Sequence, residues 1–145
     1  MQYQETELLD WYVYNLTFTA LTIGTPQTVN VAVEADSNFI LVKLTGFAEI
    51  AAALQTHDTR IVPLVTLTIV DTGSGRQLLN GATAWSNIVG TGERPYFLPI
   101  RRKWKANSNI SVVLTNVAVA GTVYNIRLSL SGIKDFGTVY KERQK

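Results

Sequence analysis

The sequence predicts an all-β domain, an antiparallel β-sandwich for which a jelly roll is one candidate form. Threonine, valine and isoleucine together make up 42 of the 145 residues, and β-branched side chains favour strands over helices. Apolar and polar residues alternate along several stretches, which is typical of strands with one buried face. Ten glycines and four prolines lie mostly between these stretches, as turns would. We see no linker and therefore expect one domain over residues 1–145.

The expected strands follow one another along the whole chain. They span residues 16–23, 29–33, 39–47, 60–70, 96–100, 110–115 and 124–130, with a further short strand at 77–79. The stretch 39–47 is apolar at almost every position, which predicts a strand packed on both faces. Residues 48–54 are the only good helix formers, and this stretch of about two turns could equally be a loop.

The two ends of the chain differ in charge. Residues 1–36 hold five acidic residues and no basic ones, whereas residues 94–145 hold ten basic residues and two acidic ones. We expect residues 1–10 to form an N-terminal arm and residues 135–145 to form a C-terminal tail. This charge separation could steer the head of one copy toward the tail of another or toward an acidic partner, or it could be a solvated surface with chance clustering.

The chain contains no cysteine, which excludes disulfides, thiolate metal sites and cysteine nucleophiles. Its N-terminus lacks a signal-peptide pattern, and no apolar run approaches the roughly 18 residues of a membrane helix. We therefore expect a soluble protein made in a reducing cytoplasm.

Residues 71–74 have the sequence Asp-Thr-Gly-Ser, which matches the active-site motif of aspartic proteases. In a homodimer, two Asp71 carboxylates would share a proton and activate water. Residues 88–90 resemble the hydrophobic-hydrophobic-Gly element of those enzymes, but only sixteen residues separate Asp71 from Ile88. Retroviral-type proteases place several strands and a flap hairpin in that interval. The favoured interpretation is a turn capped by Asp71, with the homodimeric protease as an alternative.

No other motif indicates chemistry. His57 is the only histidine, and no serine lies in a nucleophile elbow, so we interpret His57 as an exposed side chain. Histidines and carboxylates do not cluster with metal-ligand spacing, and no glycine run is followed by the Gly-Lys-Ser/Thr of a phosphate loop. We expect no enzyme activity, catalytic residue, metal or cofactor.

Residues 101–105, Arg-Arg-Lys-Trp-Lys, combine positive charge with an aromatic ring. Such a segment could bind phosphates and stack a base, but one patch on a chain of net charge +2 is weak evidence for nucleic acid. Contact with a protein and a solvated loop are equally compatible with it, since arginine and tryptophan often anchor interfaces. A third possibility is a carbohydrate-binding sandwich that uses aromatics such as Trp85 or Trp104 as sugar platforms.

Several segments carry a family resemblance. They include Ala-Asp-Ser-Asn-Phe at 35–39, Arg-Ile-Val-Pro-Leu-Val at 60–65, Asp-Thr-Gly-Ser-Gly-Arg-Gln-Leu at 71–78, Asn-Ser-Asn-Ile at 107–110 and Tyr-Asn-Ile-Arg-Leu at 124–128. Together they resemble small virion structural proteins of tailed bacteriophages, over about residues 35–130. The resemblance implies a non-enzymatic cement or decoration protein that bridges capsid subunits. It would lie in the virion capsid after assembly in the host cytoplasm.

The expected partners are the major capsid protein and copies of the chain itself; membranes, nucleic acid and small-molecule ligands are not expected. Aromatic and basic side chains near the ends and in the basic run are the candidate contact residues: Trp11, Tyr12, Tyr14, Arg101, Arg102, Lys103, Trp104, Lys105, Phe136 and Tyr140. We expect residues 1–14 and 131–145 to be disordered in a free domain and to pack on neighbouring copies or on the capsid.

Overall fold

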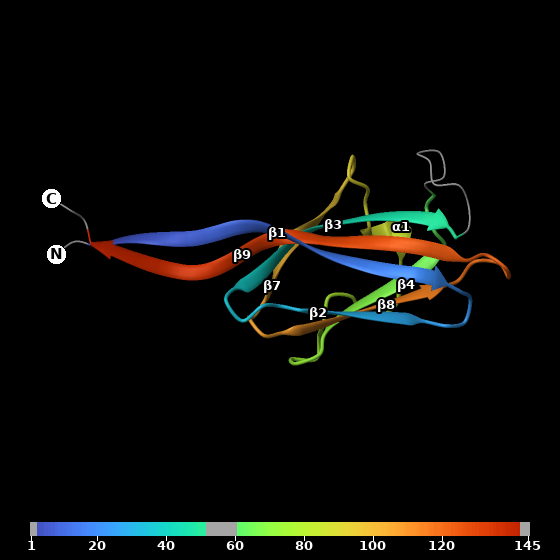
Figure 1. Ribbon diagram of the computed structural model, residues 1–145, viewed down its shortest axis with the longest axis horizontal. Coiled ribbons are helices and arrows are strands. Elements are labelled where there is room, and N and C mark those ends of the chain that lie inside the picture. The colour runs from blue at the N-terminus through green and yellow to red at the C-terminus, as the bar shows by residue number, and fades with distance from the viewer. Residues whose placement is uncertain (1–2, 52–60, 143–145) are drawn as a thin grey trace.

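The computed structural model describes residues 3–51 and 61–142, which form a β-sandwich with one short helix (Figure 1). The predicted all-β fold is therefore confirmed. The strands are β1 (Tyr3–Leu21), β2 (Gln27–Ala32), β3 (Asn38–Ile50), β4 (Val65–Asp71), β5 (Arg76–Gln77), β6 (Thr83–Ala84), β7 (Tyr96–Trp104), β8 (Asn109–Asn116) and β9 (Tyr124–Glu142). The helix α1 (Trp85–Ile88) has four residues.

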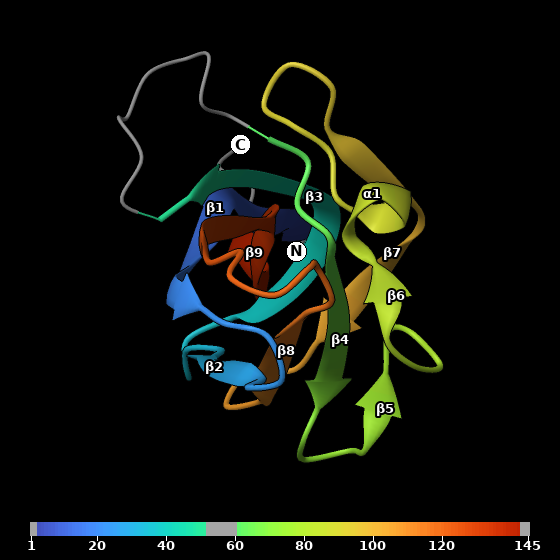
Figure 2. The same ribbon diagram turned by 90° about the vertical axis from the view of Figure 1, so that its right-hand side faces the viewer.

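The strands pair like one long hairpin that is folded back on itself. β1 pairs with β9, β2 with β8, β3 with β7, and β4 with both β5 and β6, always antiparallel. Two further ladders, β3 with β9 and β4 with β8, complete sheets with the orders β1-β9-β3-β7 and β2-β8-β4-β5. This nested pairing over two facing sheets is a jelly roll. Figure 2 shows the two sheets in a view along the molecule.

The core lies between the sheets and is filled by alternate residues of the strands. Along β8, Ile110, Val112 and Leu114 are fully buried, whereas the residues between them are partly exposed. Phe18 and Phe39 reach the same core from the facing sheet. Full burial of one such side chain stabilises the fold by about 1.5–3 kcal/mol. The period-2 pattern that predicted these strands is thus the pattern that fills the core.

Several expected bounds differ from the structure, and three of the differences lie in and around β3 and β4. Residues 48–50 are the end of β3 rather than a helix, because their ladder with β9 overrides the local helix preference; residues 52–54 lie outside the described part. β3 is not packed on both faces, since Ile40, Thr45 and Phe47 are only partly buried on its outer side. The strand expected from residue 60 begins at Val65, and Arg60 lies outside the described part.

Candidate protein-interaction site

β1 and β9 continue beyond the sandwich as a two-stranded ribbon of residues 3–9 and 136–142, which we call the arm. β3 begins at Asn38, which pairs with Asp135, so further out β9 pairs only with β1. Strand residues rise by about 3.3 Å each, so the arm is about 20 Å long. Figure 1 shows it projecting from one end of the body. Both of its edges lack a neighbouring strand in the single chain, and a lone two-stranded ribbon is only marginally stable in water.

The ends of the chain therefore do not form two independent arms. The expectation of disorder is wrong for residues 3–14 and 131–142, which pair with each other in the single chain. Pairing also places the acidic N-terminal stretch beside the basic C-terminal stretch, with Asp10 opposite Lys134. Both ends of the sequence therefore lie at one end of the molecule, so the charge difference between them along the sequence does not separate them in space.

A β-bulge marks the root of the arm. Leu8 of β1 lies opposite two residues of β9, Phe136 and Gly137. Gly137 has a φ of 90°, and its N–H donates to the Asp135 Oδ1 atom at 2.9 Å. Such a bulge bends and twists a ribbon. Leu8, Leu9 and Phe136 leave 44%, 48% and 37% of their surface exposed here, so the root of the arm presents apolar area to the solvent.

A buried lysine lies at the junction of the arm and the sandwich. Lys134 is 6% exposed, its ammonium pairs with the Glu34 carboxylate, and its Nζ atom lies 4.1 Å from the centre of the Tyr12 ring. The hydrogen bond that the Lys134 ammonium donates to the Glu34 carboxylate raises the pKa of Lys134. Tyr14 packs edge-on against Tyr12 and Phe39, and its burial raises the pKa of the phenol. Because Glu34 follows β2, this ion pair ties one sheet to the other.

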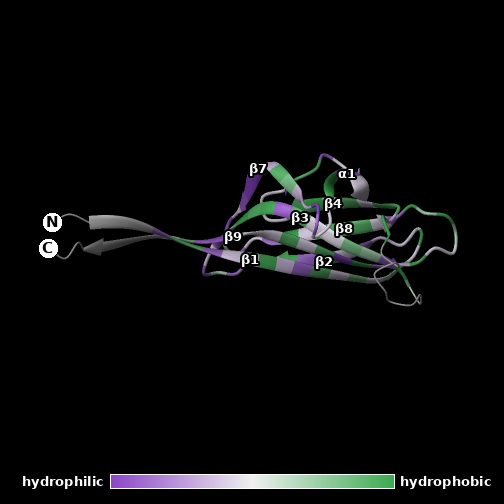
Figure 3. Ribbon diagram, turned by 90° about the horizontal axis from the view of Figure 1, so that it is seen from above, coloured by the Kyte–Doolittle hydropathy of each residue, from purple (hydrophilic) through white to green (hydrophobic). Residues whose placement is uncertain are grey.

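A second lysine lies among exposed aromatic rings on the outer face of the β1-β9-β3-β7 sheet. The Lys43 Nζ atom is 5.4 Å from the centre of the Trp11 ring and 5.9 Å from that of Phe97. Trp11 and Phe97 are 53% and 59% exposed, and Ile100 is 85% exposed on the irregular edge strand β7. Figure 3 shows β7 as a hydrophobic stretch followed by a hydrophilic one. Exposed apolar area of this kind is typical of contact surfaces.

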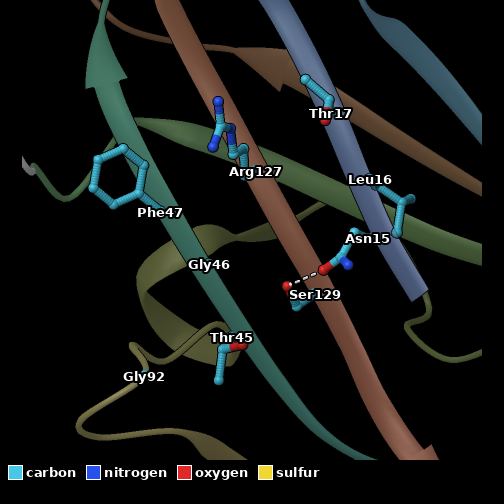
Figure 4. A pocket seen from close by; sticks show the side chains of 9 residues that line it. All are labelled: Asn15, Leu16, Thr17, Thr45, Gly46, Phe47, Gly92, Arg127 and Ser129. Atoms are coloured by element: carbon cyan, nitrogen blue, oxygen red, sulfur yellow. Dashed lines mark hydrogen bonds between the residues drawn. The ribbon is translucent and has the colours of Figure 1, made fainter. Parts of the chain in front are cut away.

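The outer face of the same sheet carries a shallow groove of about 630 Å³ (Figure 4). Arg127 and Phe47 lie along it, and the Ser129 hydroxyl donates to the Asn15 Oδ1 atom at 2.9 Å. Among the described residues, those that line the groove are uncharged apart from Arg127.

Asp71 lies in the turn between β4 and β5. Its Oδ1 atom accepts hydrogen bonds from the N–H groups of Gly73 and Ser74, at 3.1 and 3.5 Å. Asp71 thus acts as the turn cap that the sequence favoured. His57 lies outside the described residues, and the described part of the chain contains no group of three potential metal ligands. It also contains no helix that is long and apolar enough to cross a membrane.

The tryptophans proposed as platforms are internal. Trp104 is 3% exposed and stacks on Phe39, with 6.0 Å between the ring centres, and Trp85 is 4% exposed. Neither can stack a base, hold a sugar or contact a partner, so these expectations are wrong. At the end of β7 the side chains of neighbouring residues point to opposite faces, so Trp104, which pairs with Phe39, lies in the core while Lys103 stays exposed.

The other candidate contact residues are distributed along the arm side of the molecule. Trp11, Arg101, Lys105 and Phe136 are exposed, and Tyr12 and Tyr14 are partly buried in the Lys134 cluster. Arg102 is partly buried and donates to the Gln77 carbonyl oxygen at 3.3 Å, while the side chain of Tyr140 lies outside the described part. Sequence reasoning missed Phe97 and Lys134 as members of these clusters. The lone Lys43 in an apolar strand was the one visible signal.

Comparisons with known proteins give no family. No family model matches the chain, and neither does any curated protein. Among solved structures, the VP2 subviral particle of infectious bursal disease virus has a TM-score of 0.35 at 12% identity, covering 93% of this chain and 38% of that one. Dimeric latent PorU from Porphyromonas gingivalis has a TM-score of 0.33 at 10% identity, over 87% of this chain and 13% of that one. The structure of the Gt strain of infectious bursal disease virus has a TM-score of 0.32 at 11% identity, covering 92% of this chain and 33% of that one.

The chain thus spans well under half the length of the solved structures with which it compares. TM-scores of 0.32–0.35 at 10–12% identity carry no argument about function. The functional proposal therefore depends on the residues and the geometry described above.

Proposed function

We propose that the protein is a non-enzymatic structural component of a virus particle, a cement or decoration protein that bridges capsid subunits of a tailed phage. The observation that carries the proposal is the arm, a ribbon that leaves the sandwich at the Leu8 bulge. The resemblance of residues 35–130 to virion proteins of tailed phages supplies the setting. The proposed partners are the major capsid protein and further copies of the chain.

The arm suits a bridging role for two physical reasons. It exposes Leu8, Leu9 and Phe136 at its root, and burying apolar area is the main favourable term in protein association. Its edges also leave backbone N–H and C=O groups available to a neighbouring strand. A partner that covers the arm would gain both contributions, while the Lys134 cluster holds the root in place on the sandwich.

The jelly roll alone is compatible with several functions. Jelly rolls occur in viral capsid proteins, lectins and cupins, so an argument from the fold is an argument by analogy. The described residues lack a set of metal ligands of the kind a cupin would use, and two of the three tryptophans are buried. These observations favour a role in protein contact over a role in ligand chemistry.

The test is occupancy on purified particles. Deleting residues 1–10 and 137–145 should leave the sandwich folded, since its core residues lie between the sheets, but should abolish particle binding. Val119→Ser is the matched control, because Val119 is 75% exposed in the loop between β8 and β9, at the end of the body away from the arm. Particles without the protein should also lose their genome at lower temperature or salt.

Two results would contradict the proposal. Absence of the protein from purified virions would exclude a structural role. A truncated protein that decorates particles at wild-type occupancy would show that the arm is not the contact, and attention would then turn to the exposed basic residues of β7.

A further inference from the structure

A basic groove lies near the root of the arm. One wall is the turn of residues 71–76, and the other is the segment 103–109, which joins β7 to β8. The groove has a volume of about 720 Å³, and Arg76, Lys103 and Lys105 line it. The N–H and the hydroxyl of Thr72 both donate to the Asn109 carbonyl oxygen at 2.9 Å, so hydrogen bonds hold the two walls together. The groove therefore exists before any partner binds.

The described lining of this groove carries more basic than acidic side chains. Three basic side chains, those of Arg76, Lys103 and Lys105, line it. The one carboxylate in the lining is that of Asp71, whose Oδ1 atom already accepts from the backbone of the turn. All three basic side chains belong to exposed residues. A ligand that brings carboxylates or other anionic groups would gain favourable charge interactions.

The residue types that line the groove favour an acidic polypeptide over nucleic acid as its ligand. Proteins that bind single strands without sequence preference stack bases on aromatic side chains. The aromatic residue of the basic run, Trp104, is buried against Phe39, and no aromatic residue lines the groove. Three cations match a short segment with two or three carboxylates.

The chain itself contains such a segment in β1. Glu7 and Asp10 are exposed on the arm and its root, and residues 1–36 hold no basic residue. Side chains alternate along β1, so Glu7 and Leu9 lie on one face and Leu8 and Asp10 on the other, and each face offers one carboxylate and apolar area to bury. The arm of the same chain runs away from the sandwich and cannot turn back into its own groove (Figure 1). Although Asp10 lies opposite Lys134 in the ladder, the Lys134 ammonium pairs with Glu34, so the acidic side chains of β1 are available to another copy.

The arm and the groove lie at the same end of the molecule. The N–H of Ala106, in the groove wall, donates to the Asn38 Oδ1 atom at 2.9 Å, and Asn38 pairs with Asp135 at the root of the arm. Two copies related by a two-fold axis can therefore exchange arms, each arm lying in the groove of the other copy. Such a contact is closed and gives a dimer rather than a filament.

We propose that the basic groove formed by Arg76, Lys103 and Lys105 receives the acidic β1 edge of the arm of a second copy, in a reciprocal dimer. The proposal rests on the proposed function, because it names the surface that receives the arm. It also assigns the exposed acidic side chains of β1 to partner recognition, and the basic groove to the same contact.

The experiment is analytical ultracentrifugation of the full chain with charge-reversed pairs. Lys103→Glu with Lys105→Glu makes the groove acidic, and Glu7→Lys with Asp10→Lys makes the arm basic. Each double variant alone should dimerise at least about tenfold more weakly than the wild type, because both reciprocal contacts become repulsive. An equimolar mixture of the two should dimerise again, since each acidic groove then meets a basic arm. Arg127→Glu, on the outer face of β9, is the control and should leave the dimer unchanged.

Several outcomes would overturn the inference. A wild-type protein that stays monomeric at all concentrations, a mixture that fails to recover, or an equal effect of Arg127→Glu would each do so. Binding of a single-stranded oligonucleotide that is lost in Lys103→Glu with Lys105→Glu, without any dimer, would assign the groove to nucleic acid instead. If the dimer is absent but particle binding still requires the arm, the inference fails while the proposed function stands.

Discussion

The Lys134 cluster allows a stability prediction. Lys134→Met keeps an unbranched apolar side chain in the buried position but removes the charge. The contact with the Tyr12 ring, at 4.1 Å, should contribute about 1 kcal/mol. The ion pair with Glu34, whose side chain is 49% exposed, should contribute about 1 kcal/mol, well below the value of a fully buried pair. We therefore expect the free energy of unfolding to fall by about 2 kcal/mol, and Tm by about 4–8 °C for a chain of this size.

The assay is urea denaturation of the wild type, Lys134→Met, Glu34→Gln and the double variant. Because the two side chains interact directly, the double variant should be more stable than the sum of the single effects predicts, by about 1 kcal/mol. Circular dichroism of each folded variant verifies that the β-sandwich is retained. A Lys134→Met protein within about 0.5 kcal/mol of the wild type, or additive single effects, would refute the reasoning.

Three further predictions concern the strands, the pH dependence and the turn. Gly132→Ala should lower the free energy of unfolding by about 3 kcal/mol or more, because an added Cβ atom would meet the Ile40 carbonyl across the sheet. In the same urea titration, Gly73→Ala should change it by less than about 1 kcal/mol, because the nearest atom to the added Cβ lies 3.6 Å away. The pKa values of Lys134 and Tyr14 are both raised in the folded state. The stability that these two groups contribute is therefore complete below their ordinary pKa values of 10.5 and 10.0, and it is lost as the pH rises above them. Thermal unfolding should show that Tm falls in this alkaline range, and that it falls less in Lys134→Met. Asp71→Asn keeps an oxygen that can cap the turn and should leave Tm nearly unchanged. The non-enzymatic proposal would be contradicted if the wild type hydrolysed denatured protein at acid pH and Asp71→Asn did not.

Local pattern was sufficient to predict the sandwich and much of its core. In β8, Ile110, Val112 and Leu114 recur at every second position, with polar residues at 109, 111 and 115, and that period is enough to define a strand and its buried face. The turn function of Asp71 was equally predictable, because its hydrogen bonds go to residues two and three positions further along the chain.

Only the tertiary structure decided which side chains are available to a partner. The arm depends on a pairing between Tyr3 and Glu142, and no local pattern records a register across so long a sequence separation. Trp104 looked like a binding residue because it lies among basic residues, yet its neighbours across the sheet place it in the core. The basic groove and the Lys134 cluster likewise join segments that are distant in the sequence. The sequence by itself determined the strands and their buried faces, because these depend on neighbouring residues. The partner-facing surface was decided by the folded structure, because it depends on which strands pair.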